Sequence, residues 1–342
     1  MKKSILIAFL ALCIGTALES VRYYKLVKKL WLPGSAGVTA LAVLPEGRIA
    51  SGSTYGTIMI WDVESGDDIA TLRGDYNPVR ALLVLPDEKL ASIHGSRNIN
   101  IWNLKINSLQ ATLRPPMSQY LLSDISALAL LPDGIILAGS AEGYINMWTP
   151  HSKGNKQTYL LWETFLNREN VGDRPSPIHD IAAFPDGRFA TAVGVAGVVT
   201  NKIKIWNPLT DETAVWRAHQ DTITAFAELP DGRLASLAGS EIKIWNPTTH
   251  YEELVIVTDH VVPRLLVAFS NGNLASGGGS ERENTIKIWN STTGELEVTI
   301  PNTTRSTISS LAVLSDDRLA VGSADGSISI YEIKEVKNKK VE

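Results

Sequence analysis

One phrase recurs seven times along the chain, and this recurrence limits the fold more than any other feature of the sequence. Each copy has an apolar run, a turn of the Pro-Asp-Gly type, a second apolar run, a Gly/Ser-rich turn and an Ile-x-Ile-Trp ending, as in VTALAVLPEGRIASGSTYGTIMIWD from Val38. Successive copies of the final aromatic stand 39 to 58 residues apart, at Trp61, Trp102, Trp148, Trp206, Trp245, Trp289 and Tyr331. Periods of this length are typical of arrays of small sheets.

Each copy predicts three strands of an antiparallel meander, because turn residues separate its apolar and alternating segments. A fourth, more polar strand is expected after each aromatic, for example from Asp68 to Arg73 or from Glu295 to Ile300. Sheets with two apolar faces must stack on one another, and closing the stack into a circle protects their edges. The sequence therefore predicts an all-β, seven-bladed β-propeller, with the recurring aromatics buried between neighbouring sheets.

The repeats resemble those of the WD-repeat family over residues 22 to 334. The resemblance implies the family's ring closure, in which an N-terminal strand, here Tyr23 to Leu32, completes the last blade. Only Trp61-Asp62 is a literal Trp-Asp, and most copies lack the family's Gly-His and its tight-turn Asp, which is kept at Asp325. The buried His, Ser, Asp and Trp network of the family is therefore expected to be largely absent.

Four connections are longer than the repeat requires, and they indicate where a partner would dock. They are Arg114 to Asp124, Leu166 to Pro177, Val193 to Lys202 and Gly277 to Asn284. In this fold the Pro-Asp-Gly turns lie on one face and these connections on the other, so the enlargements are expected to meet on one rim. The rim residues predicted to bind a partner are Asn167, Arg168, Glu169, Asp173, Arg174 and Arg282. The alternative is that these are tolerated insertions without a role.

A second candidate site is the residue after the opening apolar position of each first strand, which is polar in all seven copies. These residues are Thr39, Arg80, Ser126, His179, Thr224, Arg264 and Ser309. In WD-repeat proteins the corresponding position lies near the mouth of the central channel and often touches partners. Two arginines and a histidine there would favour an acidic or phosphorylated ligand. The alternative is that these groups only bond channel water and neighbouring loops.

No catalytic or cofactor-binding pattern is present: the chain lacks a Gly-x-Ser-x-Gly elbow, a His-Glu-x-x-His pair and a phosphate-binding loop. We therefore expect a monomeric, non-catalytic scaffold for protein or peptide partners, without a cofactor. One alternative is a hydrolase or lyase at the channel mouth that uses His179 and Glu228. Another is a secreted carbohydrate-binding module that uses exposed aromatics such as Tyr120, Trp162 and Trp216.

The N-terminus has the form of a secretory signal, with Lys2 and Lys3 before an apolar stretch from Ile5 to Ile14 and small residues after it. Residues 1–18 are predicted to direct export to a periplasmic or extracellular location, leaving no membrane span after removal. The alternatives are a membrane anchor formed by residues 4–18 and a cytoplasmic protein. A net charge of −4 and the lack of a basic patch argue against nucleic-acid binding, and residues 335–342 form a charged tail.

Overall fold

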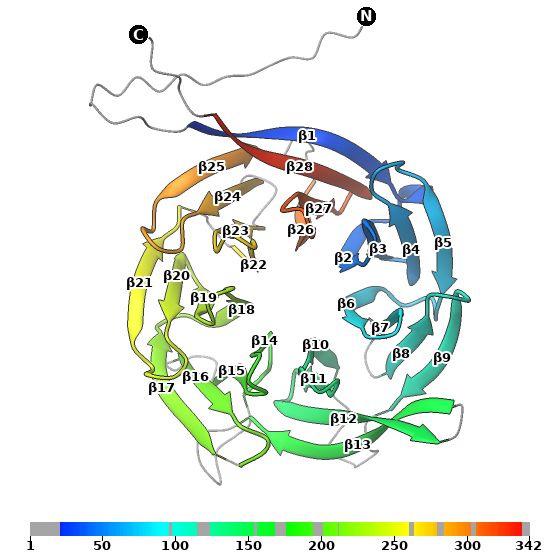
Figure 1. Ribbon diagram of the computed structural model, residues 1–342, viewed down its shortest axis with the longest axis horizontal. Coiled ribbons are helices and arrows are strands. Elements are labelled where there is room, and N and C mark those ends of the chain that lie inside the picture. Colours follow the sequence, from blue (N-terminus) through cyan, green and yellow to red (C-terminus); the bar gives the residue numbers. More distant parts are fainter. Residues whose placement is uncertain are drawn as a thin grey trace, which may run out of the picture.

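The computed structural model describes residues 21–95, 98–114, 124–153, 156–167, 176–193, 201–210, 212–259, 263–278, 284–301 and 306–336. Within these ranges, seven four-stranded antiparallel sheets are arranged as blades around a central axis, with the first strand of each blade innermost (Figure 1). This arrangement confirms the predicted seven-bladed propeller. The signal predicted for residues 1–18 lies outside the described residues.

The first three blades take one stretch of chain each, in the order inner to outer strand. Blade 1 has β2 (Val38–Leu44), β3 (Arg48–Ser53), β4 (Thr57–Asp62) and β5 (Asp68–Arg73). Blade 2 has β6 (Val79–Leu85), β7 (Lys89–His94), β8 (Asn98–Asn103) and β9 (Ser108–Leu113). Blade 3 has β10 (Ile125–Leu130), β11 (Ile136–Ser140), β12 (Tyr144–Lys153) and β13 (Lys156–Leu166).

The next three blades repeat the same order. Blade 4 has β14 (Ile181–Ala183), β15 (Phe189–Val193), β16 (Asn201–Trp206) and β17 (Thr213–His219). Blade 5 has β18 (Ile223–Glu228), β19 (Leu234–Ala238), β20 (Glu241–Trp245) and β21 (Glu252–Val257). Blade 6 has β22 (Leu265–Ala268), β23 (Leu274–Gly277), β24 (Thr285–Trp289) and β25 (Leu296–Pro301).

Blade 7 joins the two ends of the chain. Its inner strands are β26 (Ile308–Val313), β27 (Leu319–Ser323) and β28 (Ser327–Val336), and its outer strand is β1 (Val21–Trp31), which runs beside β28 in Figure 1. The register pairs Val21 with Val336 and Trp31 with Ser327. A short 3-10 turn, η1 (Pro33–Ser35), then leads into blade 1. The predicted closure of the ring by the N-terminal strand is confirmed.

The recurring aromatics are buried between blades, as predicted, with exposed fractions of 2% to 6%. In five blades the Trp Nε1 donates a hydrogen bond to a hydroxyl on the second strand at 2.7 to 2.8 Å. The pairs are Trp61–Ser51, Trp102–Ser92, Trp206–Thr191, Trp245–Ser236 and Trp289–Ser276. The expectation that the family's buried polar network is largely absent is therefore wrong for the Trp–hydroxyl contact.

Histidine extends this polar contact in two blades. His94 Nε2 lies 2.8 Å from Ser92 Oγ, and His219 Nε2 lies 2.7 Å from Ser236 Oγ. Each of these two serine hydroxyls therefore joins a tryptophan to a histidine, within blade 2 for His94 and between blades 4 and 5 for His219, which ends β17. The repeats do not reveal this network when they are aligned. In blade 4 the hydroxyl belongs to Thr191 and not to a serine, and in blade 2 the histidine, His94, comes from the second strand of the same blade.

Blade 3 lacks the hydroxyl, and Trp148 Nε1 is buried without a hydrogen-bond partner. The cause is Ala138, which occupies the strand position held by serine or threonine in the five blades above. We expect Ala138→Ser to stabilise the protein by ~1 kcal/mol, because it gives a buried N–H group an acceptor. Urea unfolding measures this change. The same substitution at Ala91, a buried position beside Ser92, should destabilise, and a destabilised Ala138→Ser variant would contradict the explanation.

Arginines that follow the Pro-Asp-Gly turns connect neighbouring blades. Arg188 donates to Pro247 O at 3.2 Å, and Arg233 donates to Ser291 O at 3.2 Å, each reaching the turn between the third and fourth strands of the next blade. Arg318 reaches Glu64 of blade 1 in the same way. Each guanidinium also bonds the aspartate of its own turn, so both ends of the link are held.

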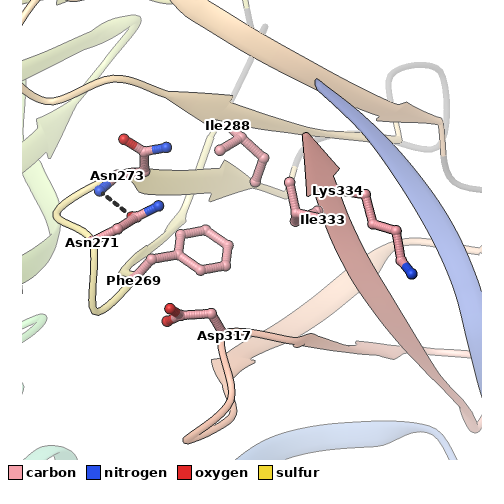
Figure 2. A pocket seen from close by; sticks show the side chains of 7 residues that line it. All are labelled: Phe269, Asn271, Asn273, Ile288, Asp317, Ile333 and Lys334. Carbon is pink, nitrogen blue, oxygen red and sulfur yellow. Dashed lines mark hydrogen bonds between the residues drawn. The ribbon is translucent and has the colours of Figure 1, made fainter. Parts of the chain in front are cut away.

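This link is missing between blades 6 and 7, where the ring closes. Blade 6 has Asn273 in the place of the arginine. Blade 7 also lacks the turn that would accept the hydrogen bond, because its third strand, β28, is not connected by a turn to its outer strand, β1. A hollow of about 190 Å³ lies here, with Phe269, Ile288 and Ile333 around it (Figure 2). Asp317 bridges the two blades instead, accepting hydrogen bonds from the backbone N–H and the hydroxyl of Ser270.

Candidate functional site

Because the seven blades share one register, the structure brings the seven polar channel residues to one end of the ring, where the inner strands begin. We call this end the upper face and the opposite end, with the Pro-Asp-Gly turns, the lower face. Four of the seven residues are partly buried on the upper face: Thr39, Ser126, Thr224 and Ser309. Ser126 Oγ donates to Ile178 O and Ser309 Oγ donates to Val38 O, both at 2.5 Å and both in the next blade. These two hydroxyls therefore hold blades together.

Arg80, His179 and Arg264 are the exposed members of the ring, so they form the part available to a partner. Arg80 lies 3.3 Å from Asp124, with both side chains substantially exposed. Exposed ion pairs of this kind contribute little free energy, so a ligand anion can compete for the guanidinium. Arg80 and Arg264 thus supply the positive charge at the channel mouth.

His179 is less suited to a cationic role than its sequence position suggests. Partial burial and the nearby charge of Arg264 lower the pKa of its imidazole below the usual value. The imidazole of His179 is therefore neutral near pH 7, and the channel mouth carries two cations, Arg80 and Arg264, rather than three. An anionic ligand bound beside it would raise the pKa of His179 again.

Asp180 follows His179 and was not singled out by the sequence. Its carboxylate accepts a hydrogen bond from its neighbour Ile181 N at 2.9 Å and one from Phe226 N of blade 5 at 2.8 Å. Burial raises the pKa of this carboxyl to about 6. Ala40 and Ala127 hold the equivalent positions in blades 1 and 3, so an aspartate among small apolar residues was the feature of the sequence that could have indicated Asp180. Asp180 ties blade 4 to blade 5 directly below the channel mouth.

The enlarged connections leave the described blades at the upper face, as predicted. The connection into blade 4 and the long second turn of that blade start side by side, because Asn167 Nδ2 donates to Ala192 O at 2.6 Å. Asn167 also accepts a hydrogen bond from Thr191 and is 0% exposed. Its prediction as a partner contact is therefore wrong: it anchors the connection. The other predicted rim residues, Arg168, Glu169, Asp173, Arg174 and Arg282, lie outside the described residues.

Three aromatic side chains that sequence reasoning missed are exposed on the upper face. Trp31 at the end of β1 is 53% exposed, Tyr55 in the second turn of blade 1 is 60% exposed, and Tyr76 in the connection to blade 2 is 96% exposed. The two tyrosine loops touch, since Gly56 packs against Asp75 O so closely that a Cβ there would clash. We call these three residues the aromatic arc. Tyr55 and Tyr76 lie in turns, away from the apolar strand pattern, and this was the available signal for these two residues.

His179 and Glu228, which the hydrolase alternative needs together, lie at opposite ends of the inner strands. Glu228 ends β18, four residues after the channel-mouth residue Thr224, which corresponds to about 13 Å along a strand. Among the described residues, no three His, Cys, Asp or Glu side chains gather as a metal site requires. The described structure therefore does not assemble the catalytic pair of that alternative.

One of the three aromatic residues proposed for carbohydrate binding is not freely exposed. Trp216 stacks on His250 with ring centroids 4.8 Å apart and also contacts Trp245, so its ring is partly covered within the protein. Tyr120 lies outside the described residues, as does the side chain of Trp162. The aromatic arc provides exposed aromatic side chains on the upper face instead.

Comparison with known proteins agrees with the blade structure. A family model described as "WD domain, G-beta repeat" matches residues 25–62 and 294–332, which lie in blades 1 and 7 and in the last turn and outer strand of blade 6. No curated protein matches the chain. Across the described residues, the structure contains no helix with the length and apolar character of a membrane span. The two matched segments and the seven closed blades together support a β-propeller of the WD-repeat type.

Proposed function

We propose that the chain is a non-catalytic scaffold that binds a protein or peptide partner on its upper face. The observation that carries the proposal is the coincidence, on one face, of the aromatic arc, two exposed arginines and the starts of all four enlarged connections. Tyrosine, tryptophan and arginine are the residues that most often dominate binding energy at protein interfaces. A propeller of this family is consistent with such a role, because its strands form a rigid support for exposed loops.

An acidic or phosphorylated segment is the partner chemistry that fits the channel mouth best. Arg80 and Arg264 are exposed and can form charge-assisted hydrogen bonds with carboxylate or phosphate groups. The aromatic arc adds apolar contact area at low conformational cost, because aromatic side chains have few rotatable bonds. The arginines would orient the partner, and the aromatic arc would supply much of the affinity.

Crosslinked affinity capture from native cells tests this proposal, with bound proteins identified by mass spectrometry. We expect an enriched partner to be lost with the Arg80→Ala/His179→Ala/Arg264→Ala variant and weakened at least about tenfold with Trp31→Ala/Tyr55→Ala/Tyr76→Ala. The matched control is Ile106→Ala/Leu209→Ala/Tyr251→Ala, which removes three exposed side chains at the lower face. Equal capture by wild type and both upper-face variants would contradict the proposal.

We also propose that residues 1–18 direct export and are then removed. The charged start, the short apolar stretch and the small residues after it are the features of a secretory signal. Mass spectrometry of the mature N-terminus, together with fractionation of the native cells, tests this proposal. A mature protein that keeps Met1, or one found only in the cytoplasm, would contradict it.

A further inference from the structure

The lower face contains an apolar hollow that the upper-face function does not use. It has a volume of about 370 Å³ and lies beside the channel, across the Pro-Asp-Gly turns of blades 2, 3 and 4. Its walls include Pro86, Leu130, Pro132, Ala183 and Pro185, and its one charged lining residue is Glu228. A site of this size and composition suits a single aliphatic chain with one polar end.

Glu228 is an exception within an otherwise apolar ring. The equivalent positions in the other six blades are Val43, Val84, Leu130, Ala183, Ala268 and Val313. No described residue donates a hydrogen bond to the Glu228 carboxylate, and the charge that acts on it most is another carboxylate, Asp186. Burial and this like charge raise the pKa of Glu228 above its usual value. A cation placed in the hollow would relieve both effects.

The turns around the hollow expose their acidic side chains and largely bury their basic side chains. In the turns of blades 4 and 5, the carboxylates of Asp186 and Asp231 have side chains that are 51% and 54% exposed. The arginines of the same turns, Arg188 and Arg233, are only 24% and 19% exposed, because they point towards the neighbouring blades. These turns contain equal numbers of acidic and basic residues, but the acidic side chains are the exposed ones. The surface offered to a partner is therefore acidic.

We propose that the lower face binds a basic segment of a partner protein and that one lysine or arginine side chain of this segment enters the hollow. The aliphatic stem of that side chain packs against Pro86, Leu130 and Pro185, and its charged end pairs with Glu228. The acidic turns attract the rest of the segment and orient its approach. This surface is separate from the upper face, so the scaffold would hold an acidic partner on one side and a basic partner on the other.

Fluorescence anisotropy with a labelled peptide of alternating lysine and glycine tests the proposal. We expect saturable binding that becomes at least about tenfold weaker when every lysine is replaced by Nε-acetyl-lysine, which keeps the stem and removes the charge. Glu228→Gln should weaken binding about fivefold, and Ala183→Phe, which fills the hollow, should weaken it by a similar factor. The matched control Glu46→Gln removes an exposed carboxylate of the same face and should change the affinity less than about twofold.

Four results would overturn the proposal. Equal affinity for the lysine and acetyl-lysine peptides would show that charge is not recognised. Equal weakening by Glu228→Gln and Glu46→Gln would show that the general negative charge of the lower face acts without the hollow. Absence of saturable binding, or binding of n-butylammonium as tight as that of the peptide, would remove the peptide as the occupant. The upper-face variants leave this surface intact, so failure here is distinguishable from failure of the proposed upper-face function.

Discussion

Deletion of residues 1–31 is expected to abolish cooperative folding of the propeller, whereas deletion of residues 1–20 is expected to leave it intact. The longer deletion removes β1, which pairs with β28 from Val21 to Trp31. It also removes the buried Leu30 from the cluster that contains Trp61 and Ile330. Each large apolar side chain contributes roughly 1.5 to 3 kcal/mol when buried, against a typical total stability of about 5 to 15 kcal/mol.

Two further effects enlarge the loss. Without β1, the N–H and C=O groups along one edge of β28 lose their partners, and an open edge of this kind promotes aggregation. Lys28 also donates to Glu64 O and Ser65 O, so its removal frees blade 1 from the closing strand. Circular dichroism and urea unfolding measure the outcome. A synthetic peptide of residues 21–32 should restore a cooperative transition to the deleted chain, and a deleted chain that unfolds cooperatively without the peptide would contradict the closure.

The fold could be predicted from the sequence because each blade repeats the same local signals. Turn residues, apolar runs and the terminal aromatic recur in register, so seven weak patterns support one another. The expected outer strand from Asp68 to Arg73 has the same bounds as β5. The closing strand was also predictable, since blade 7 needed a fourth strand and the chain offered one before blade 1.

The candidate site could be predicted only in part, because its residues depend on contacts between blades. The register showed which seven residues meet at the channel mouth, but it could not show that Ser126 and Ser309 bond to the next blade while Arg80 remains exposed. Asn167 was misread for the same reason, since its partners lie 9 to 25 residues away in the sequence. The hollow beside Glu228 arises from turns of several blades, which no single repeat reveals.

The stability of the protein is expected to fall between pH 6.5 and pH 4.5 largely through His219. Burial and the charge of Lys243 lower the pKa of His219 to about 3, and its Nδ1 is buried without a hydrogen-bond partner. Between the folded pKa and the unfolded value of 6.5, the unfolded chain binds more protons at this site, so unfolding becomes easier as the pH falls. One unit of pKa shift corresponds to ~1.4 kcal/mol, so His219 should account for about 2 to 3 kcal/mol over this range.

Urea unfolding of wild type and His219→Gln at pH 8, 6.5, 5.5 and 4.5 isolates this contribution. The variant should be less stable at pH 8, because it loses contacts with Ser236 and Trp245, but its stability should decline less as the pH falls. Asp180 has the opposite sign: its raised pKa favours the folded state as the pH falls from about 6 to 3.8, and this term cancels between wild type and variant. The matched control His151→Gln alters an exposed histidine outside this network, so the contribution assigned to His219 should remain. Parallel pH profiles for wild type and His219→Gln would show that the buried Trp245–Ser236–His219 network does not set the acid limit of the propeller.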